Sequence, residues 1–323
     1  MTAGPRPRVF ATRGLPGAAL ETLGRATALE VWGGPGAPPR EALRARVADA
    51  EGLLCLLTDR VDAALLAASH RLRAVSSCSV GLDHVDLAAA TARRIPVGHT
   101  PGVLTDTTAE LAIALLFAAA RRVVEADRFV REGRWREWSP ELMLGRDLAG
   151  STLGVIGLGA IGQAVAARAR ALGVRVLGWN RTPRDAPGVE QVPLPELLAR
   201  SDFVSVHVAL VPETLGLLDA AALARMRAGA VLVNVARGGI VDEAALAAAL
   251  ASGRLAAAAL DVFATEPLLP SSPLLAAPNL VLTPHIGSAS VRTRTRMADL
   301  AVENLLAALR GERMPRCANP EVY

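Results

Sequence analysis

Three polar segments in the second half of the chain contain residue types that could act together on a carbonyl group. An arginine can hold a carboxylate and polarise a carbonyl oxygen, while a histidine can give that oxygen a proton. A glutamate that accepts a hydrogen bond from the other ring nitrogen would orient the histidine. We predict that such a set is catalytic here and serves the reduction of a 2-oxo acid. Its members are Arg237 in Asn234–Asp242, Glu266 in Asp261–Pro267 and His285 in Thr283–Ser288.

Strands that end just before these segments would bring them together. Short β-type runs alternate with Ala- and Leu-rich stretches, which is typical of parallel sheets built from βαβ units. The carboxyl ends of the strands in such a sheet converge on the ligand crevice. From Ser151 onward we therefore predict a six-stranded doubly wound sheet. Its strands are expected near Leu153–Gly157, Arg175–Trp179, Phe203–Val208, Val231–Val235, Ala258–Val262 and Leu280–Thr283.

The first part of the chain predicts a second parallel-sheet unit, so the expected fold class is α/β with two such units. Strands are predicted near Val9–Thr12, Leu53–Leu57, Ala74–Ser77 and Pro96–His99, with helices near Pro16–Leu23, Pro39–Ala50, Asp62–Ser69 and Asp86–Arg93. A long helix is expected from Thr105 to about Arg122, and a last one from about Val291 to Arg310. Arg134–Pro140 breaks the pattern and is predicted to be an exposed arm.

A glycine loop joins the first strand and helix of the six-stranded sheet. Gly157 permits the tight turn, Gly159 lets the backbone approach a pyrophosphate, and Gly162 packs the helix on the strand. The helix N-terminus would then face the phosphates with free N–H groups. This pattern, between a strand and a helix and followed by a second strand, predicts a dinucleotide site.

The end of that second strand departs from the usual dinucleotide pattern. A carboxylate there would accept the ribose hydroxyls of NAD and repel a 2′-phosphate. Here the position holds Asn180, with Arg181 next and Arg184 close by. Guanidinium groups make forked, charge-assisted hydrogen bonds to phosphate, so we predict a preference for NADP(H). The alternative is that Arg181 is an ordinary solvated arginine and that the site accepts either dinucleotide.

Composition narrows the other possibilities. The formal charge of +4 is modest for 323 residues, and all 35 basic residues are arginines, many of them interleaved with acids. Aromatic residues make up only 3%, which disfavours stacking on nucleic acid. Cys55, Cys78 and Cys317 lack metal-binding spacing, so no metal is expected and a reducing compartment fits. With no signal pattern and no apolar run that could span a membrane, we expect a cytoplasmic protein.

Several ordered motifs make the chain resemble the D-isomer-specific 2-hydroxyacid dehydrogenase family over nearly its whole length. Within that family it is most similar to the group of glyoxylate and hydroxypyruvate reductases. Besides the three catalytic segments, the motifs that carry the likeness are Leu53–Asp59, Ser79–His84, Thr100–Glu110, Gly157–Gly162 and Leu309–Pro315.

The resemblance implies a domain division and a substrate pocket. Residues 1–103 and 289–323 would form a flavodoxin-like substrate domain, with an NADP-binding Rossmann domain, 104–288, inserted between them. Backbone N–H groups near Val80 and Gly81 would receive the substrate carboxylate, and Leu56 and Leu57 would line a small pocket. Further substrate contacts would come from Arg237, Asp261, His285 and Ser288.

The resemblance also implies cofactor contacts and a partner subunit. Residues Gly157, Gly159, Ala160, Ile161 and Gly162 would lie at the pyrophosphate, and Asn180, Arg181, Thr182, Pro183 and Arg184 at the 2′-phosphate. Ala209, Val235 and Gly287 would lie along the cofactor. In similar reductases a tryptophan from the partner subunit closes the pocket, and Trp138 on the arm matches it, so a homodimer is expected. The alternative for Trp138 is an aromatic residue that packs between subunits without touching substrate.

The function implied is NADPH-dependent reduction of hydroxypyruvate to D-glycerate and of glyoxylate to glycolate, with His285 as proton donor. Two other readings stay open. The first is another D-2-hydroxyacid dehydrogenase, although phosphoglycerate dehydrogenase is disfavoured by the missing acid near Asn180 and formate dehydrogenase by Glu266, where that enzyme carries an amide. The second is a dinucleotide-sensing corepressor-like protein, which would bind NADPH but oxidise it only slowly.

Overall fold

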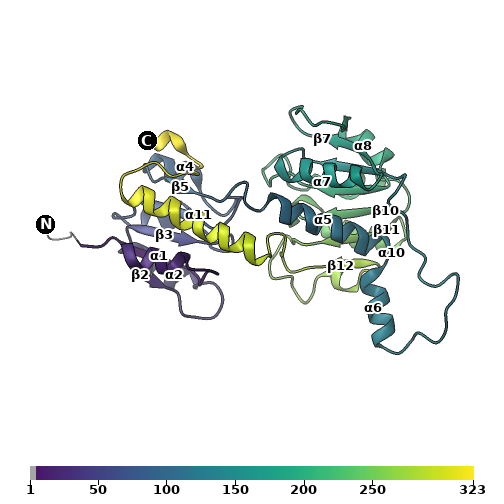
Figure 1. The fold of residues 1–323 in the computed structure, drawn as a ribbon, viewed down its shortest axis with the longest axis horizontal. Helices are drawn as coiled ribbons and strands as arrows, with labels where there is room; N and C mark the ends of the chain where they lie inside the picture. Colours follow the sequence, from purple (N-terminus) through teal and green to yellow (C-terminus); the bar gives the residue numbers. More distant parts are fainter. Residues whose placement is uncertain (1–4) are drawn as a thin grey trace. The chain divides into compact units, whose positions relative to one another are not determined.

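The structure, a computed structural model, describes residues 5–323 and divides into two compact units. The first unit comprises the described residues up to Leu104 together with Ala289–Tyr323, and the second comprises Thr105–Ser288. The C-terminal segment therefore returns to the unit in which the chain begins, and the second unit is continuous in sequence (Figure 1).

The first unit is built on a five-stranded parallel sheet of order β2-β1-β3-β4-β5. The chain reverses its direction of winding between β1 and β3, which makes that pair the topological switch point of the sheet. The strands are β1 (Arg8–Ala11), β2 (Ala28–Val31), β3 (Gly52–Cys55), β4 (Ala74–Ser77) and β5 (Val97–Gly98). The helices are α1 (Ala19–Ala26), α2 (Arg40–Ala48), α3 (Ala63–Ala67), α4 (Leu87–Ala92) and α11 (Val291–Leu309), with a 3₁₀ turn η3 (Pro320–Val322).

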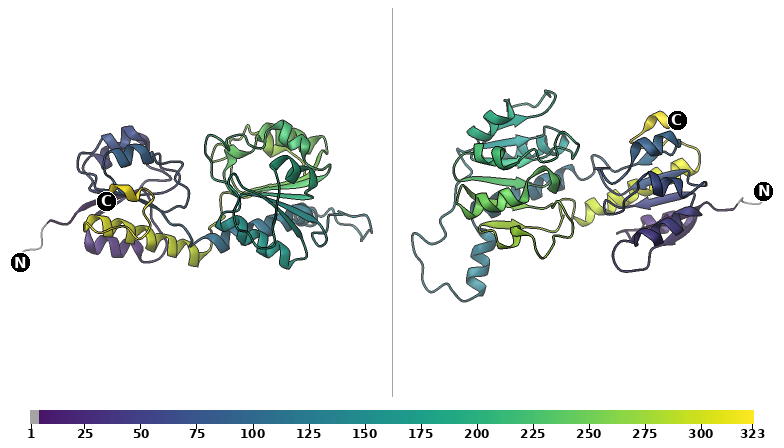
Figure 2. Two further views of the ribbon diagram at one scale, coloured as in Figure 1. Left: turned by 90° about the horizontal axis from the view of Figure 1, so that it is seen from above. Right: turned by 180° about the vertical axis from the view of Figure 1, so that it is seen from behind.

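Helices cover both faces of this sheet because its central strands are apolar on both sides. Successive side chains of a strand point to opposite faces, and in β3 Leu53 and Cys55 pack with α2, α3 and α4. Leu54 packs on the other face with α1 and α11. The two helical layers can be followed in Figure 2.

The second unit holds a seven-stranded parallel sheet of order β12-β11-β10-β9-β6-β7-β8. Its winding reverses between β6 and β9, the switch point at which dinucleotide-binding folds take their ligand. The strands are β6 (Thr152–Ile156), β7 (Arg175–Trp179), β8 (Glu190–Gln191), β9 (Phe203–Val206), β10 (Ala230–Asn234), β11 (Leu255–Leu260) and β12 (Leu280–Leu282).

This sheet is also covered on both faces. Helices α5 and α7 contribute to one buried apolar cluster, and α8, α9 and α10 contribute to the other. The helices are α5 (Thr105–Ala120), α6 (Val123–Arg131), α7 (Ala160–Ala171), α8 (Leu194–Arg200), α9 (Ala220–Arg225) and α10 (Glu243–Ala251), with 3₁₀ turns η1 (Gly238–Ile240) and η2 (Pro273–Ala276). The predicted fold class is thereby confirmed: both units are parallel α/β sheets.

Three elements were absent from the prediction. Strand β2 is short and mostly exposed, so it lacks the apolar signal of a central strand. Strand β8 has only two exposed residues, and it raises the predicted six strands to seven. Helix α6 has no buried residue, so tertiary packing within the described chain does not explain its apolar side chains. The exposed arm is confirmed, since 131–142 is exposed throughout. No helix within residues 5–323 is long and apolar enough to cross a membrane.

Candidate active site

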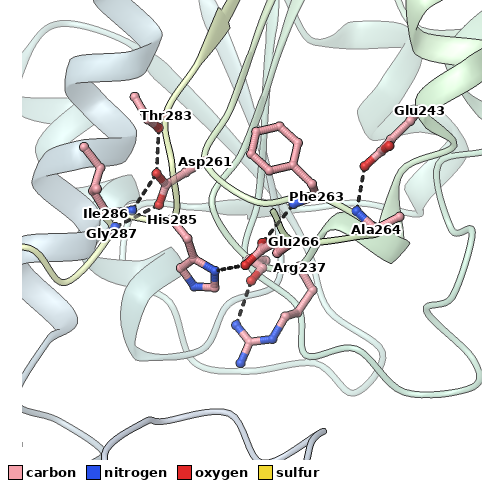
Figure 3. A network of polar contacts seen from close by, with 11 residues as sticks. Arg237, Glu243, Asp261, Phe263, Ala264, Glu266, Thr283, His285, Ile286 and Gly287 are labelled. Atoms are coloured by element: carbon pink, nitrogen blue, oxygen red, sulfur yellow. Dashed lines mark hydrogen bonds and ion pairs between the residues drawn. The ribbon is translucent and has the colours of Figure 1, made fainter. Parts of the chain in front are cut away.

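Three adjacent strands of the second unit bring the predicted catalytic segments together. Strands β10, β11 and β12 are neighbours in the sheet and run parallel. Arg237 lies three residues beyond β10, Glu266 lies in the loop after β11, and His285 follows β12. Figure 3 shows the three side chains gathered in one cluster, with Asp261 beside them. Residues that are far apart in the sequence therefore come together because the strands that precede them are neighbours in the sheet.

A histidine–carboxylate pair forms the centre of this cluster. His285 Nδ1 lies 2.7 Å from Glu266 Oε2, and both side chains are about one-quarter exposed. Glu266 Oε1 accepts the Phe263 N–H at 3.0 Å. Burial raises the pKa of the Glu266 carboxyl, but the hydrogen bonds from His285 and Phe263 and the nearby positive charges of His285 and Arg237 outweigh it. The net pKa of Glu266 lies below its ordinary 4.5, so the carboxylate stays ionised at neutral pH.

Asp261 holds the loop that carries the histidine. Its side chain is 1% exposed. Oδ1 accepts from Thr283 Oγ1 at 2.6 Å and from the Ile286 N–H at 2.8 Å, and Oδ2 accepts from the Gly287 N–H at 2.8 Å. Burial raises the pKa of Asp261, and these hydrogen bonds oppose the rise. Both carboxylate oxygens are therefore engaged in shaping the loop on either side of His285.

The backbone of His285 adopts an unusual conformation. Its φ is 54°, in the left-handed region that non-glycine residues rarely occupy. The His285 N–H donates to the carbonyl of Asp261 at 2.9 Å and to that of Thr283 at 3.0 Å, which ties it to the end of β11. Residues held in such regions by their surroundings cluster at functional sites.

The loop that carries Arg237 depends on a buried amide and a close backbone approach. Asn234 is fully buried, donates from Nδ2 to the Arg237 carbonyl at 2.9 Å and accepts the Ala236 N–H at 3.0 Å. A Cβ at Gly238 would lie 1.8 Å from the backbone carbon of Phe263. Only glycine allows the loops after β10 and β11 to approach this closely, and the approach places Arg237 next to Glu266 (Figure 3).

The glycine loop after β6 has the geometry of a dinucleotide cradle. Gly157 has a φ of 101°, and a Cβ on Gly162 would lie 1.9 Å from the Gly157 carbonyl oxygen, so both positions require glycine. A Cβ on Gly159 would meet no atom within 4 Å, which leaves that face open to a ligand. Gly159 is also the N-cap of the twelve-residue helix α7, whose first N–H groups lack intrahelical partners.

The end of β7 is shaped by Asn180 and leaves its arginine side chains exposed. Asn180 accepts the Leu158 N–H at 3.1 Å and donates to the Thr182 carbonyl at 2.7 Å, so it links the glycine loop to the next turn. Arg181 is 73% exposed and lies 3.7 Å from Glu213 Oε2. The backbone of Arg184 is held on both sides by Gln191 of β8. These residues fit a phosphate-bearing nucleotide. Within the described positions 180–184 both arginine side chains are exposed, and the acidic side chain paired with them is that of Glu213.

The remaining sites predicted in the second unit lie along the same edge of the sheet. Ala209 is exposed in the loop after β9, and Val235 follows β10 and is buried. Gly287 is buried against Asp261 and Thr108, and Ser288 ends the unit half-buried. These four predicted contacts therefore all lie beyond the carboxyl ends of strands.

In the first unit the predicted pocket residues also follow strand ends. Leu56 and Leu57 lie half-buried in the turn after β3. Val80 and Gly81 follow β4, and their carbonyls are engaged by His99 Nδ1 at 3.1 Å and by Ser79 Oγ at 2.8 Å. The backbone of this loop is therefore well held.

The arm and α6 present an exposed apolar surface. Trp138 is 77% exposed and lies in the arm. The neighbouring exposed apolar side chains are Val123, Val124, Val130, Trp135, Leu142 and Leu144. Several large apolar side chains left exposed over one stretch of chain are typical of protein interfaces.

Four residues that shape the cluster escaped the sequence analysis, namely Asn234, Gly238, Phe263 and Thr283. Asn234 ends an otherwise apolar strand, where a polar amide is a usable signal. Nothing in the sequence distinguishes Gly238 from Gly239, because the requirement arises only from the neighbouring loop. No group of three or more potential metal ligands was found in the part of the chain that the structure describes.

Fold and cluster together define an α/β dinucleotide-binding oxidoreductase, and comparison with known proteins places the chain more closely. Residues 113–287 match the family described as "D-isomer specific 2-hydroxyacid dehydrogenase, NAD binding domain". The chain belongs to this family.

Full-length relatives agree with that assignment. A glyoxylate reductase of Korarchaeum cryptofilum is 48% identical over 322 residues, which cover 98% of this chain and 97% of that protein. A Thermus thermophilus protein of known structure is 51% identical with a TM-score of 0.92, covering 96% and 99% of the two chains. The NADPH-dependent glyoxylate/hydroxypyruvate reductase of Sinorhizobium meliloti, solved with NADP and malonate, is 35% identical with a TM-score of 0.86, covering 98% of both chains.

Proposed function

We propose that this protein reduces small 2-oxo acids, hydroxypyruvate and glyoxylate in particular, with NADPH. The observation that carries the proposal is the His285–Glu266 pair at 2.7 Å beside Arg237, at the carboxyl ends of adjacent strands. The relatives from Korarchaeum cryptofilum, a glyoxylate reductase, and Sinorhizobium meliloti, a glyoxylate/hydroxypyruvate reductase, support the substrate class.

In this proposal His285 is the proton donor. Glu266 holds Nδ1, which directs Nε2 of the same ring toward the substrate carbonyl oxygen. The bound dinucleotide supplies the hydride to the 2-carbon. As the hydride arrives, the imidazolium gives its Nε2 proton to the oxygen, and a 2-hydroxy acid results.

Arg237 would bind the substrate carboxylate and polarise the carbonyl. In the first unit, the N–H groups near Val80 and Gly81 would receive a substrate carboxylate, and Leu56 and Leu57 would line a small pocket. In the second unit, Ser288 is a further proposed substrate contact. With these assignments the first unit, described here by residues 5–103 and 289–323, is the substrate domain. Residues 104–288 are the cofactor domain, and the boundary between the two lies near Leu104.

For Asp261 we propose a positioning role in place of direct substrate contact. Its oxygens accept three hydrogen bonds from Thr283, Ile286 and Gly287. A carboxylate so engaged and 1% exposed has little capacity left for a ligand.

The proposed cofactor is NADP(H). The open face at Gly159 and the start of α7, with Ala160 and Ile161, would hold the pyrophosphate. Arg181 and Arg184 would bind the 2′-phosphate, with Thr182 and Pro183 in the same turn, and Asn180 would hold that turn on the glycine loop. Ala209, Val235 and Gly287 would line the rest of the dinucleotide.

We further propose a cytoplasmic homodimer. The exposed apolar side chains of α6 and the arm would be buried in an interface with a second copy of the chain. In that interface each copy would insert Trp138 into the pocket of its partner. The described cysteines are all free, which agrees with a reducing compartment.

The test is steady-state turnover of NADPH and, separately, NADH with hydroxypyruvate and glyoxylate. We expect turnover of both substrates and a kcat/KM for NADPH about tenfold or more above that for NADH, since charge-assisted hydrogen bonds contribute 1.5–3 kcal/mol. Equal use of the two dinucleotides would overturn the cofactor assignment alone. Binding of NADPH without turnover of any 2-oxo acid would overturn the enzyme assignment and favour a dinucleotide sensor.

A further inference from the structure

A buried carboxylate lies at the switch point of the first sheet, and the proposed mechanism does not use it. Asp59 is 2% exposed and closes the turn that follows β3. Its Oδ2 accepts the Leu56 N–H at 2.8 Å, while the Asp59 N–H donates to the Leu56 carbonyl at 3.0 Å. The two residues therefore close the turn from both sides.

The adjacent strand β1 supplies the other half of the arrangement. Thr12 follows β1, is fully buried and donates from its hydroxyl to Asp59 Oδ2 at 2.5 Å. Arg13 Nη1 lies 3.7 Å from Asp59 Oδ1, and its Nη2 donates to Thr58 Oγ1 at 3.1 Å. One carboxylate thus joins the carboxyl ends of β1 and β3.

This connection between β1 and β3 lies where a ligand is expected to bind. Strands β1 and β3 are neighbours across the reversal in the order β2-β1-β3-β4-β5. In open α/β sheets, ligands bind outside the carboxyl ends of the strands at such a reversal. Between its two ends the turn carries Leu56 and Leu57, both half-buried and so partly presented to solvent.

We propose that Asp59, with Thr12 and Arg13, is a positioning residue that holds the Leu56–Thr58 turn in the conformation that binds the 2-oxo acid. This inference rests on the proposed function of the chain. Burying a carboxyl group costs free energy even when it is hydrogen-bonded, so its place here is explained if the turn must be held in one conformation. If only a fraction of molecules held that conformation, the apparent affinity for substrate would fall by the same fraction.

The experiment compares Asp59→Ala, Asp59→Asn and Thr12→Val in the full chain. Asp59→Ala leaves the Leu56 N–H without its acceptor, and we expect KM for hydroxypyruvate to rise about tenfold or more. Asp59→Asn keeps an oxygen acceptor and should restore most of the affinity. Thr12→Val removes one donor at nearly constant volume and should fall between them. In each variant, kcat and the dissociation constant of NADPH should stay near the wild-type values.

Two control variants separate positioning from a general loss of stability. Asp62→Ala removes the N-cap of α3, three residues further on, and lowers stability without touching the turn. Thr22→Val makes the same change as Thr12→Val at an exposed position of helix α1. Both should leave KM for hydroxypyruvate unchanged.

An unchanged KM in Thr12→Val and Asp59→Ala, or an equal rise in Asp62→Ala, would overturn the positioning role. If Asp59→Ala does not fold, Thr12→Val decides the matter: an unchanged KM for hydroxypyruvate would overturn the positioning role, and a rise with kcat near the wild-type value would support it. Failure of the proposed function itself is distinct, because wild-type protein would then turn over no 2-oxo acid at all.

Discussion

The two ends of the candidate site in the second unit are held in different ways. At the ends of β10–β12, His285 and Glu266 are about three-quarters buried and connected through Asp261 and its loop. At the end of β7, the Arg181 side chain is 73% exposed, and that of its ion-pair partner Glu213 is 63% exposed. The proposed chemical end is thus held by hydrogen bonds within the protein, whereas the proposed cofactor-selecting end relies on side chains in solvent.

This difference predicts unequal sensitivity to mutation. Groups preorganised in a partly dry site contribute more than exposed charges, which water and salt screen. Substitutions at the β10–β12 ends should change rates by large factors, and those at the β7 end should change cofactor selectivity by small ones.

The largest effect is expected for His285→Ala. Loss of the proton donor should lower kcat by about 10²–10⁴-fold, while the dissociation constant of NADPH stays unchanged. His70→Ala, an exposed histidine in the first unit, is the matched control. Stopped-flow and fluorescence titration measure the two quantities, and a variant with normal kcat would remove His285 from the mechanism.

Gly238→Ala should come next. The new Cβ would lie 1.8 Å from the Phe263 backbone, so the Arg237 loop must move. A displacement of about 1 Å at a catalytic group costs on the order of 10²-fold in rate. Gly239→Ala is the control, because its Cβ meets only the ends of Leu215 and Leu210, at 3.3 Å and beyond. Similar kcat/KM values for the two variants would show that the close approach is unimportant.

Glu266→Gln tests the charge on the orienting group. Since hydrogen bonds to charged groups contribute about 1.5–3 kcal/mol, we expect a decrease in kcat/KM of about 10–100-fold. The pKa of Glu266 lies below 4.5 in the folded protein. The charged carboxylate therefore contributes fully to orienting His285 above pH 4.5, and this contribution is lost as the pH falls through the lowered pKa. The wild-type pH profile between about 5 and 8 should therefore show no step from this carboxylate. A step there that disappears in the Gln variant would contradict the assignment.

Arg181→Ala should act on selectivity alone. We expect KM for NADPH to rise about tenfold and KM for NADH to change little, because only the former carries the 2′-phosphate. Arg175→Ala, an exposed and paired arginine at the opposite end of β7, serves as the control. Equal losses for both dinucleotides would reduce Arg181 to a surface residue.

The smallest effect is expected for Glu213→Gln. Exposed ion pairs contribute about 0.2–1 kcal/mol, so releasing Arg181 from this partner should improve KM for NADPH by no more than about fivefold. The gain should shrink as salt is added. A gain of a hundredfold would mean that the β7 end is as strongly organised as the β10–β12 ends, and the contrast between them would not hold.

Much of the site could be predicted because its signals are local. The glycines of the loop after β6 occur at fixed offsets between a strand and a helix, and the strand boundaries near Arg175–Trp179 matched the observed ones. Arg237, Glu266 and His285 stood out because they lie in polar segments that come after apolar strands, and the carboxyl ends of parallel strands meet at one edge of a sheet. What could not be predicted was the loops' internal packing, such as the grip of Asp261 on Gly287.

The sequence by itself determined the parallel α/β architecture, the cofactor loop and the residue types at the strand ends, because periodicity, glycine and charge act over a few neighbouring residues. Only the tertiary structure decided that β8 extends the sheet to seven strands, that Gly238 rather than Gly239 must be glycine, and that Asp59 and Asp261 are occupied by backbone N–H groups. Each of these depends on an approach between loops that are distant in the chain. Such distances are set by how the sheet packs and are encoded in no single segment.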